Sequence, residues 1–393
     1  SLTIDTTGTG GVTADVTLGG ALGGGADGSL DGGVTITADT VLGGQNITTA
    51  GGTLDENGGA VTITTGSGAT SIGAIDSSGN NDGNGGNVDI DTGVGPLAVG
   101  AITTSGGNGG ADTAGTILLQ TGVGITGANS SGNTTLNGNL TAAGTAGNTI
   151  TLGGAGNAQF ILGNNIAITT GSGAGNINIT TTNGIDATTQ GDETLSMTSG
   201  TGTITVNGPL GDDGNNLELG GVTISGTQLN LNSDIYTDGS VNNGNVDLSG
   251  VTTVQLGADV TIDTSNGASA AGTVTFNGTG SLIDDGADGT TRDLTIDTNG
   301  IGASDGDITL PATIGQADGV GNEEIGVLTL TPSNADAILG ASGVTYHTSG
   351  ITATGRVVLT GDSTLNTNGG DFDFTSSSIT SDANGKWDLN INT

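Results

Sequence analysis

Residues 73–93 read GAIDSSGNNDGNGGNVDIDTG, and residues 100–122 read GAITTSGGNGGADTAGTILLQTG. Both stretches start with Gly-Ala-Ile, continue through a tract rich in Ser, Thr, Gly and Asn, and end in a run that alternates apolar and polar residues. A period of two places the apolar side chains of a strand on one face. The two stretches therefore predict short strands that recur along the chain and are joined by glycine-rich turns.

The recurring element is glycine, any residue, an apolar residue, any residue and a second apolar residue. It begins at Gly59, Gly86, Gly115, Gly175, Gly202, Gly244, Gly272, Gly306, Gly326, Gly355, Gly370 and Gly385, and a one-residue slip of it follows Gly147. Most copies lie about 28 residues apart, and a strand motif with a period of this size is typical of a solenoid. The interval after Gly202 is longer, and the last two intervals are about half as long.

The composition agrees with this interpretation. The chain of 393 residues has 81 Gly, four Pro and no Cys, and aromatic residues make up 2%. In a β-solenoid each strand pairs with its equivalent in the next coil, and small aliphatic residues fill a narrow interior. No stretch keeps the apolar period of a helix, so we expect no helix longer than two turns.

The sequence thus predicts an all-β, right-handed parallel β-helix of roughly 14 coils. We expect a single continuous solenoid over residues 1–393, with an irregular insertion at 207–243 and a modified end at 355–393. The alternation predicts that six isoleucines point inward, namely Ile75, Ile90, Ile102, Ile117, Ile177 and Ile179. It predicts that Asp89, Asp91, Asn176 and Asn178 point outward.

The charge excludes several classes of partner. The formal net charge is −36, from 39 acidic residues against Arg292, Arg356 and Lys386. Such a surface repels nucleic-acid phosphates and anionic lipids, so we expect neither as a direct partner. No apolar run approaches the length of a membrane span, and we recognise neither a signal peptide nor a transit peptide. The lack of Cys fits a reducing compartment or a secreted fibre without disulfides.

At this level the chain resembles the filamentous-haemagglutinin-like and β-strand-repeat surface proteins of bacteria. The resemblance is carried by LGADVTIDTSNGASAAGTVTFNGTG (256–280) and GRVVLTGDSTLNTNGGDFDFTSS (355–377). It implies a right-handed parallel β-helix on a secreted or cell-surface protein. The secretion domain of such proteins is not recognisable in this sequence, which leaves the export route open.

Catalytic chemistry finds little support in the residues. His347 is the one histidine, and the alternation in VTYHTSG places it beside Thr345 on the outward face. Some β-helices cleave acidic polysaccharides with clustered Asp near a cation, and Arg292 close to Asp284, Asp285 and Asp288 is the place to look. Three cations and few aromatic residues argue against that class, so we expect no catalytic and no cofactor-binding residues.

Metal binding is left open by the acidic turns. Asp212 with Asp213, Asp284 with Asp285, and the loop from Asp76 to Asp82 could hold Ca²⁺ weakly through carboxylate and carbonyl oxygens. Neither the calcium-binding nonapeptide repeat nor an EF-hand loop occurs, so solvated turn residues are the simpler interpretation.

Two further features of the sequence could indicate binding, to ice or to a ligand. Thr-x-Thr triplets recur at Thr35–Thr37, Thr62–Thr64, Thr149–Thr151 and Thr203–Thr205, as an ice-binding ladder would require. Asp or Asn replaces the outward Thr in other coils, and Thr is also favoured on exposed strands. Trp387 stands at an apolar position of the motif, which favours packing in the core or at a subunit contact over ligand stacking.

We therefore expect a structural module of a bacterial fibre, adhesin stalk or extracellular matrix filament, secreted or on the cell surface. It would act by rigidity and by self-association, either head to tail or as part of a longer chain, because neither SLTIDTTG nor KWDLNINT offers a cap for an end coil. A surface glycan or protein receptor is a further expected partner. The alternative is a carbohydrate-active β-helix enzyme of the polysaccharide lyase or hydrolase type.

Overall fold

The computed structural model describes the chain in segments. They are residues 1–7, 14–23, 30, 32–52, 55–107, 112–121, 132–145, 148–154, 159–212, 216–265, 270–284, 290–300, 305–315, 324–332, 334–339, 344–367, 369–382 and 387–393. These residues form strands and turns without any helix, and the strands pair in parallel, which confirms the all-β parallel solenoid. Two compact units divide the chain, residues 1–188 with 196–208 and residues 189–195 with 209–393.

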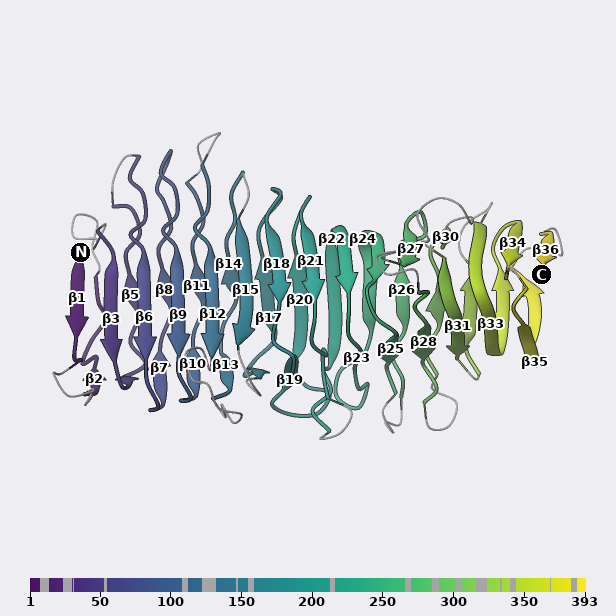
Figure 1. Ribbon diagram of the computed structural model, residues 1–393, viewed down its shortest axis with the longest axis horizontal. Coiled ribbons are helices and arrows are strands. Elements are labelled where there is room, and N and C mark those ends of the chain that lie inside the picture. The colour runs from purple at the N-terminus through teal and green to yellow at the C-terminus, as the bar shows by residue number, and fades with distance from the viewer. Residues whose placement is uncertain are drawn as a thin grey trace. The chain divides into compact units, whose positions relative to one another are not determined.

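In the first unit each coil contributes strands to three faces (Figure 1). The first face consists of β1 (Leu2–Asp5), β3 (Val34–Ala38), β6 (Val61–Thr65), β9 (Val88–Thr92), β12 (Ile117–Thr121), β15 (Thr149–Gly154), β18 (Asn176–Ile179) and β21 (Thr203–Val206). The second consists of β7 (Thr70–Ile72), β10 (Leu97–Val99), β13 (Thr134–Leu136), β16 (Phe160–Leu162) and β19 (Ile185–Ala187). The third holds β5 (Ile47–Thr48), β8 (Ile75–Asp76), β11 (Ile102–Thr103), β14 (Leu140–Thr141) and β17 (Ile166–Thr169).

Three short or divided strands complete this part of the chain. The strands β2 (Val16–Thr17) and β4 (Val41–Leu42) pair with each other. The strand β20 (Thr194–Thr198) is shared between the residue ranges of the two units.

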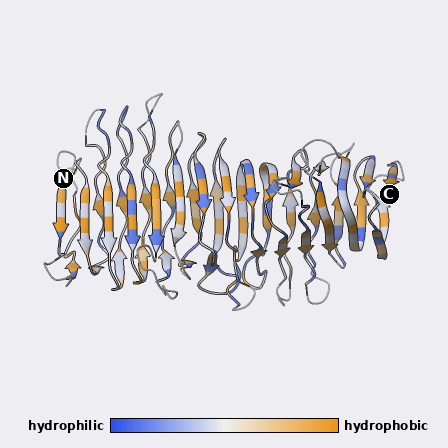
Figure 2. Cartoon of the chain, in the orientation of Figure 1, coloured by the Kyte–Doolittle hydropathy of each residue, from blue (hydrophilic) through white to orange (hydrophobic). Residues whose placement is uncertain are grey.

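The core of the first unit is a set of apolar columns that run from coil to coil. One column on the first face is Val34, Val61, Val88, Ile117, Ile150, Ile177 and Ile204. The six isoleucines that the sequence places inward are all 0% or 1% exposed, whereas Asn176 is exposed and Asp89, Asp91 and Asn178 are partly exposed. Figure 2 shows the resulting alternation of hydrophobic and hydrophilic positions along the strands. The predicted register is confirmed.

In the second unit longer strands replace some of the turns. Its strands are β22 (Gly221–Leu231), β23 (Ile235–Tyr236), β24 (Val246–Leu256), β25 (Val260–Asp263), β26 (Val274–Phe276), β27 (Ser281–Asp284), β28 (Leu294–Asp297), β29 (Ile308–Thr309), β30 (Thr313–Ile314), β31 (Ile325–Thr331), β32 (Asp336–Leu339), β33 (Val344–Leu359), β34 (Ser363–Asn366), β35 (Phe372–Ser381) and β36 (Leu389–Asn392). Part of β24 pairs with β26 and part with β27, so one strand serves two faces.

The strand β33 explains one of the short motif intervals near the C-terminus. Its 16 residues pair in turn with β30, β31 and β32. The motif copy at Gly355 lies on the face of β32, whereas the copy at Gly370 leads into β35 on the face of Ile351. These two consecutive copies therefore fall on different faces, and the interval between them does not mark a half-sized coil. The extent of one continuous solenoid over residues 1–393 stays a prediction.

Candidate functional site

A buried hydroxyl and the motif glycine close one corner of the coil. Thr104 is 0% exposed and donates its hydroxyl hydrogen bond to Gly115 O at 2.7 Å, while Gly115 N donates to Thr104 O at 2.7 Å. Equivalent hydroxyl bonds run from Thr49 to Gly59, Ser77 to Gly86, Thr170 to Gly175, Ser199 to Gly202, Thr237 to Gly244, Thr264 to Gly272, Thr298 to Gly306 and Thr367 to Gly370. We call these the corner hydrogen bonds. Each satisfies a buried polar group and fixes the two ends of a loop.

The coil that contains the one-residue slip of the motif closes its corner with a different hydrogen-bond donor. Ala142 stands where the other coils have Thr or Ser, and it has no hydroxyl to donate. In that coil Asn148 occupies the place of the motif glycine, and its Nδ2 donates to Ala142 O at 2.9 Å. The slip in the motif therefore coincides with an exchange of donor at the corner.

The motif glycines are required by the close stacking of the coils. A Cβ at Gly115 would lie 2.0 Å from Gly86 O, and one at Gly202 would lie 1.8 Å from Gly175 O. These glycines do not have a positive φ, unlike Gly244 and the turn residues Asp55 and Asn81. Conformational freedom explains some of the turns, but the repeated motif glycine avoids a clash with the backbone of the preceding coil.

Three neighbouring loops and the start of a fourth stack on one another in a thin projection. Each of them follows a strand of the third face. We call residues 50–52, 55–58, 78–85, 105–107, 112–114 and 143–145 the loop stack; Figure 1 shows the loop between β8 and β9 extending beyond the strands. The two arms of one loop touch through their backbones, since a Cβ at Gly79 would lie 2.0 Å from Gly83 O. This close contact explains why the residues at 77–86 are almost all small.

Backbone hydrogen bonds hold the loop stack together. Gly51 N donates to Ser78 O at 2.8 Å, and Gly79 N donates to Ser105 O at 2.8 Å. On the returning arms, Gly58 N donates to Asn84 O at 2.8 Å. The tracts that read as irregular turns in the sequence therefore continue the parallel pairing of the coils, because each loop bonds to the equivalent loop of the next coil.

Asn and Asp side chains add a second link between coils. Asn87 Oδ1 accepts a hydrogen bond from Thr116 N at 2.9 Å, and Asn176 Oδ1 accepts one from Thr203 N at 2.9 Å. The same inter-coil Asx bond joins Asp39 to Ser67, Asn46 to Ala74, Asn57 to Asn84, Asn84 to Thr113, Asn139 to Ala167, Asp234 to Thr261, Asn245 to Thr273, Asp259 to Asp293, Asp293 to Val327, Asp305 to Asn334, Asp307 to Asp336 and Asp362 to Asp388. Many of the abundant Asx residues are therefore structural.

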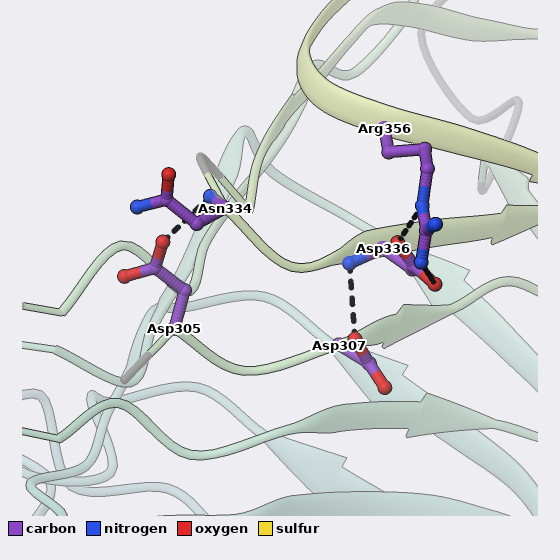
Figure 3. A network of polar contacts seen from close by, with 5 residues as sticks. All are labelled: Asp305, Asp307, Asn334, Asp336 and Arg356. Atoms are coloured by element: carbon purple, nitrogen blue, oxygen red, sulfur yellow. Dashed lines mark hydrogen bonds and ion pairs between the residues drawn. The ribbon is translucent and has the colours of Figure 1, made fainter. Parts of the chain in front are cut away.

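Figure 3 shows two of these bonds beside an ion pair in the second unit. Asp307 Oδ1 accepts from Asp336 N at 2.9 Å, and both carboxylate oxygens of Asp336 accept from Arg356, at 2.6 Å each. The hydrogen bonds and charge of Asp336 raise the pKa of Arg356. Because Arg356 is 56% exposed, this pair contributes little to stability and chiefly neutralises two neighbouring carboxylates.

An outward column of the first face contains two aspartates in different surroundings. The column runs Asp5, Thr37, Thr64, Asp91. Partial burial, together with the charge of Asp89, raises the pKa of Asp91. Hydrogen bonds from the hydroxyl and the N–H of Thr7 lower the pKa of Asp5. Ionisation of Asp91 therefore opposes folding, whereas ionisation of Asp5 supports it.

The opposite shifts predict opposite effects of removing the charge. Asp91→Asn should stabilise the protein at pH 7, and its advantage should shrink as the pH falls toward about 4, because protonation of Asp91 then relieves the same penalty. Asp5→Asn should destabilise it at pH 7 and still do so near pH 4, because the lowered pKa keeps Asp5 ionised there, and the difference should fade only at lower pH. Urea midpoints at pH 7, about 4 and about 2 test this. If both variants were stabilised at neutral pH, overall charge repulsion and not the local surroundings would be the cause.

Of the residues that the sequence grouped around Arg292, the structure describes Asp284 and Arg292, and it brings these two together. Asp284 is 0% exposed, and its Oδ2 accepts from the backbone N of Arg292 at 2.9 Å, so this carboxylate holds a turn. Asp285 and Asp288 lie outside the described residues. A depression of about 390 Å³ beside β33 has Asp371 as the one ionisable side chain among its described lining residues. The described residues of these two places thus give Asp284 a structural role and leave Asp371 as the carboxylate beside the depression.

The other candidate residues have structural surroundings. His347 lies partly exposed beside buried Tyr346, as the alternation predicts. Asp76 Oδ1 accepts from Ser78 N at 3.1 Å and from its hydroxyl at 2.7 Å, whereas Asp82 is exposed. Asp212 is partly exposed, and Asp213 lies outside the described residues. Within the described segments no group of three or more His, Cys, Asp or Glu side chains is placed to hold a metal ion.

The structure also shows the surroundings of two features that were considered as binding elements, the Thr-x-Thr triplets and Trp387. Thr35 and Thr37 lie opposite Thr62 and Thr64, but Asp89 and Asp91 follow in the next coil, so the threonine array ends there. Trp387 is partly exposed and its Nε1 donates to Asp382 at 2.5 Å. Trp387 is therefore not buried in the core of this chain, and its packing at a subunit contact stays a prediction.

The corner hydrogen bonds, the loop stack and the inter-coil Asx bonds were not foreseen. The sequence does contain a signal for the corner hydrogen bonds. A Thr or Ser stands two positions after the last apolar residue of the third face, as in Ile75-Asp76-Ser77. Within the described segments no helix has the length and hydropathy of a membrane crossing. Comparison with protein-family models, curated proteins and solved structures gives no match.

Proposed function

We propose that this chain is a structural module of a bacterial fibre, adhesin stalk or extracellular matrix filament, secreted or on the cell surface. The observation that carries the proposal is the use of the outward polar side chains. Asn and Asp side chains on the outer surface reach the backbone of the next coil one after another. Hydrogen-bonded ladders, corner bonds and Asx bonds together favour a stiff element.

Self-association through strand edges is the second part of the proposal, either between copies or with further coils of a longer chain. Ile379 and Ile391 are 41% and 45% exposed, although their register partners Val357 and Leu365 are 2% and 1% exposed. Apolar residues of the core columns thus remain open on β35 and β36, which favours their burial against another parallel strand. Lateral association is opposed by the net charge of −36.

The test compares assembly of the chain with that of two β36 variants. We expect concentration-dependent linear assemblies in electron microscopy and light scattering, increasing with salt as charge repulsion is screened. Ile391→Asp should raise the concentration needed for assembly at least about tenfold, because a charge would replace an apolar contact. Asn390→Asp adds the same charge on the outward side of β36 and should leave assembly nearly unchanged.

Two results would contradict the proposal. One is a monodisperse monomer at every concentration and salt level. The other is equal assembly of the Ile391→Asp and Asn390→Asp variants, which would place the contact elsewhere.

A further inference from the structure

The base of the loop stack contains two buried oxygen atoms without hydrogen-bond partners in the structure. They are Oδ2 of Asp112 and Oδ1 of Asn148, on side chains that are 5% and 2% exposed. A buried acceptor without a donor is costly, and a buried carboxylate is more costly still. Most buried polar side chains in native proteins have a partner, so this pair requires an explanation.

Both side chains belong to the same small region. Asp112 O accepts hydrogen bonds from Thr145 N at 3.0 Å and from its hydroxyl at 2.9 Å. A Cβ at Gly144 would lie 3.2 Å from Asp112 O and 3.0 Å from Asn148 Nδ2. The backbone oxygen of Asp112 and Nδ2 of Asn148 therefore lie beside the same glycine, which places the two residues at the step between the loop that follows β11 and the loop that follows β14.

Both residues also replace glycines of the preceding coil. Asn84 Oδ1 accepts from Thr113 N, so the residue before Asn84, Gly83, is the equivalent of Asp112. In the next step along the stack, Asn148 takes the place of Gly115. Asp112 and Asn148 thus each place an oxygen-bearing side chain where the preceding coil has a glycine, at two successive steps of the stack.

No basic side chain can neutralise Asp112 from within this unit. Residues 1–208 contain neither Lys, Arg nor His in the sequence, so the counter-charge must come from solution. We infer that Asp112 and Asn148 form the protein part of a site for a hard divalent cation of the calcium class. Ca²⁺ prefers carboxylate, amide and carbonyl oxygens, and water completes its shell.

The donor set predicts weak affinity. Calcium sites are tuned by the number of charged ligands, and a site with one carboxylate belongs at the millimolar end of the range, where extracellular modules bind. The site differs from the acidic turns at Asp76–Asp82, Asp212 and Asp284, whose carboxylates either hold the backbone or face solvent. It would join two neighbouring loops of the stack, and it does not depend on the proposed fibre function.

Thermal unfolding of the full chain in millimolar CaCl₂, with NaCl matched for ionic strength, tests the site. The wild type should show a saturable rise in Tm, and Asp112→Asn should lose it, with Ca²⁺ affinity reduced at least about tenfold. Asp82→Asn removes one exposed charge from the same loop stack and should respond like the wild type. The double variant Ala142→Thr with Asn148→Gly restores the corner found in the other coils and should bind Ca²⁺ more weakly.

Each alternative outcome decides against the inference. Equal calcium responses of wild type and Asp112→Asn would remove Asp112 from the site. A wild type whose Tm does not respond to Ca²⁺ would show that no calcium-class cation occupies this place. If Asp112→Asn does not fold, unchanged affinity in the double variant would likewise overturn the site.

Discussion

Replacing Ile177 by Asp should lower the free energy of unfolding by about 5 kcal/mol or more. Ile177 is 0% exposed and stands in the column between Ile150 and Ile204. The substitution removes an apolar side chain from a closely packed column and places a carboxylate where no basic group can reach it. Urea unfolding followed by circular dichroism should show a large fall in the midpoint or loss of the β signal.

The control is the next residue in the same strand. Asn178 lies on the outward side of β18 between Thr151 and Thr205, so Asn178→Asp should change stability by about 0.5 kcal/mol or less. The two variants have the same new charge one residue apart and differ in the face on which it lies. Equal tolerance of both would refute the register of the first face.

The second large effect concerns a glycine with no unusual backbone conformation. Gly115→Ala should cost about 3 kcal/mol, because the added Cβ would lie 2.0 Å from Gly86 O and 2.3 Å from Gly86 C. Both atoms belong to the backbone of the preceding coil, so relief requires the coils to separate. The same movement would strain the corner hydrogen bond with Thr104. Urea midpoints measure the loss.

Gly20 provides the matched control for this substitution. It is exposed, and an added Cβ would meet no atom within 4 Å. Gly20→Ala should be neutral or stabilise by up to about 1 kcal/mol, since alanine restricts the unfolded chain. A comparable loss of stability in both variants would show that backbone freedom, and not the stacking distance, is what the glycines supply.

The strand register could be predicted because it depends on a local pattern. Ile177 and Asn178 differ in polarity, and a period of two assigns them to opposite faces without knowledge of their partners. The same reasoning placed Tyr346 inward and His347 outward. It does not by itself decide the burial of Trp387, because an apolar residue at a motif position is buried only if another coil or subunit covers it.

The links between coils could not be predicted, because they join residues about one coil apart. The bond from Thr116 N to Asn87 Oδ1 requires knowing which residue of the next coil lies above Asn87. The intervals of the motif did not supply this, since the corner hydrogen bonds close loops with sequence separations from 3 to 11 residues. For the same reason the motif slip at Gly147 gave no hint that Nδ2 of Asn148 and the backbone oxygen of Asp112 lie beside one glycine.

The inter-coil Asx bonds give the chain a direction of growth. In the bonds described above, the side-chain oxygen belongs to the earlier coil and the N–H to the later one, as from Asn176 to Thr203 and from Asp307 to Asp336. A finished coil therefore presents acceptors already in position for the backbone N–H groups of the coil synthesised after it, and side chains of that later coil, such as those of Thr145 and Asn164, donate back to carbonyl oxygens of the earlier one. Folding that proceeds from the N-terminus would therefore add each coil to a coil whose Asx acceptors are already in place.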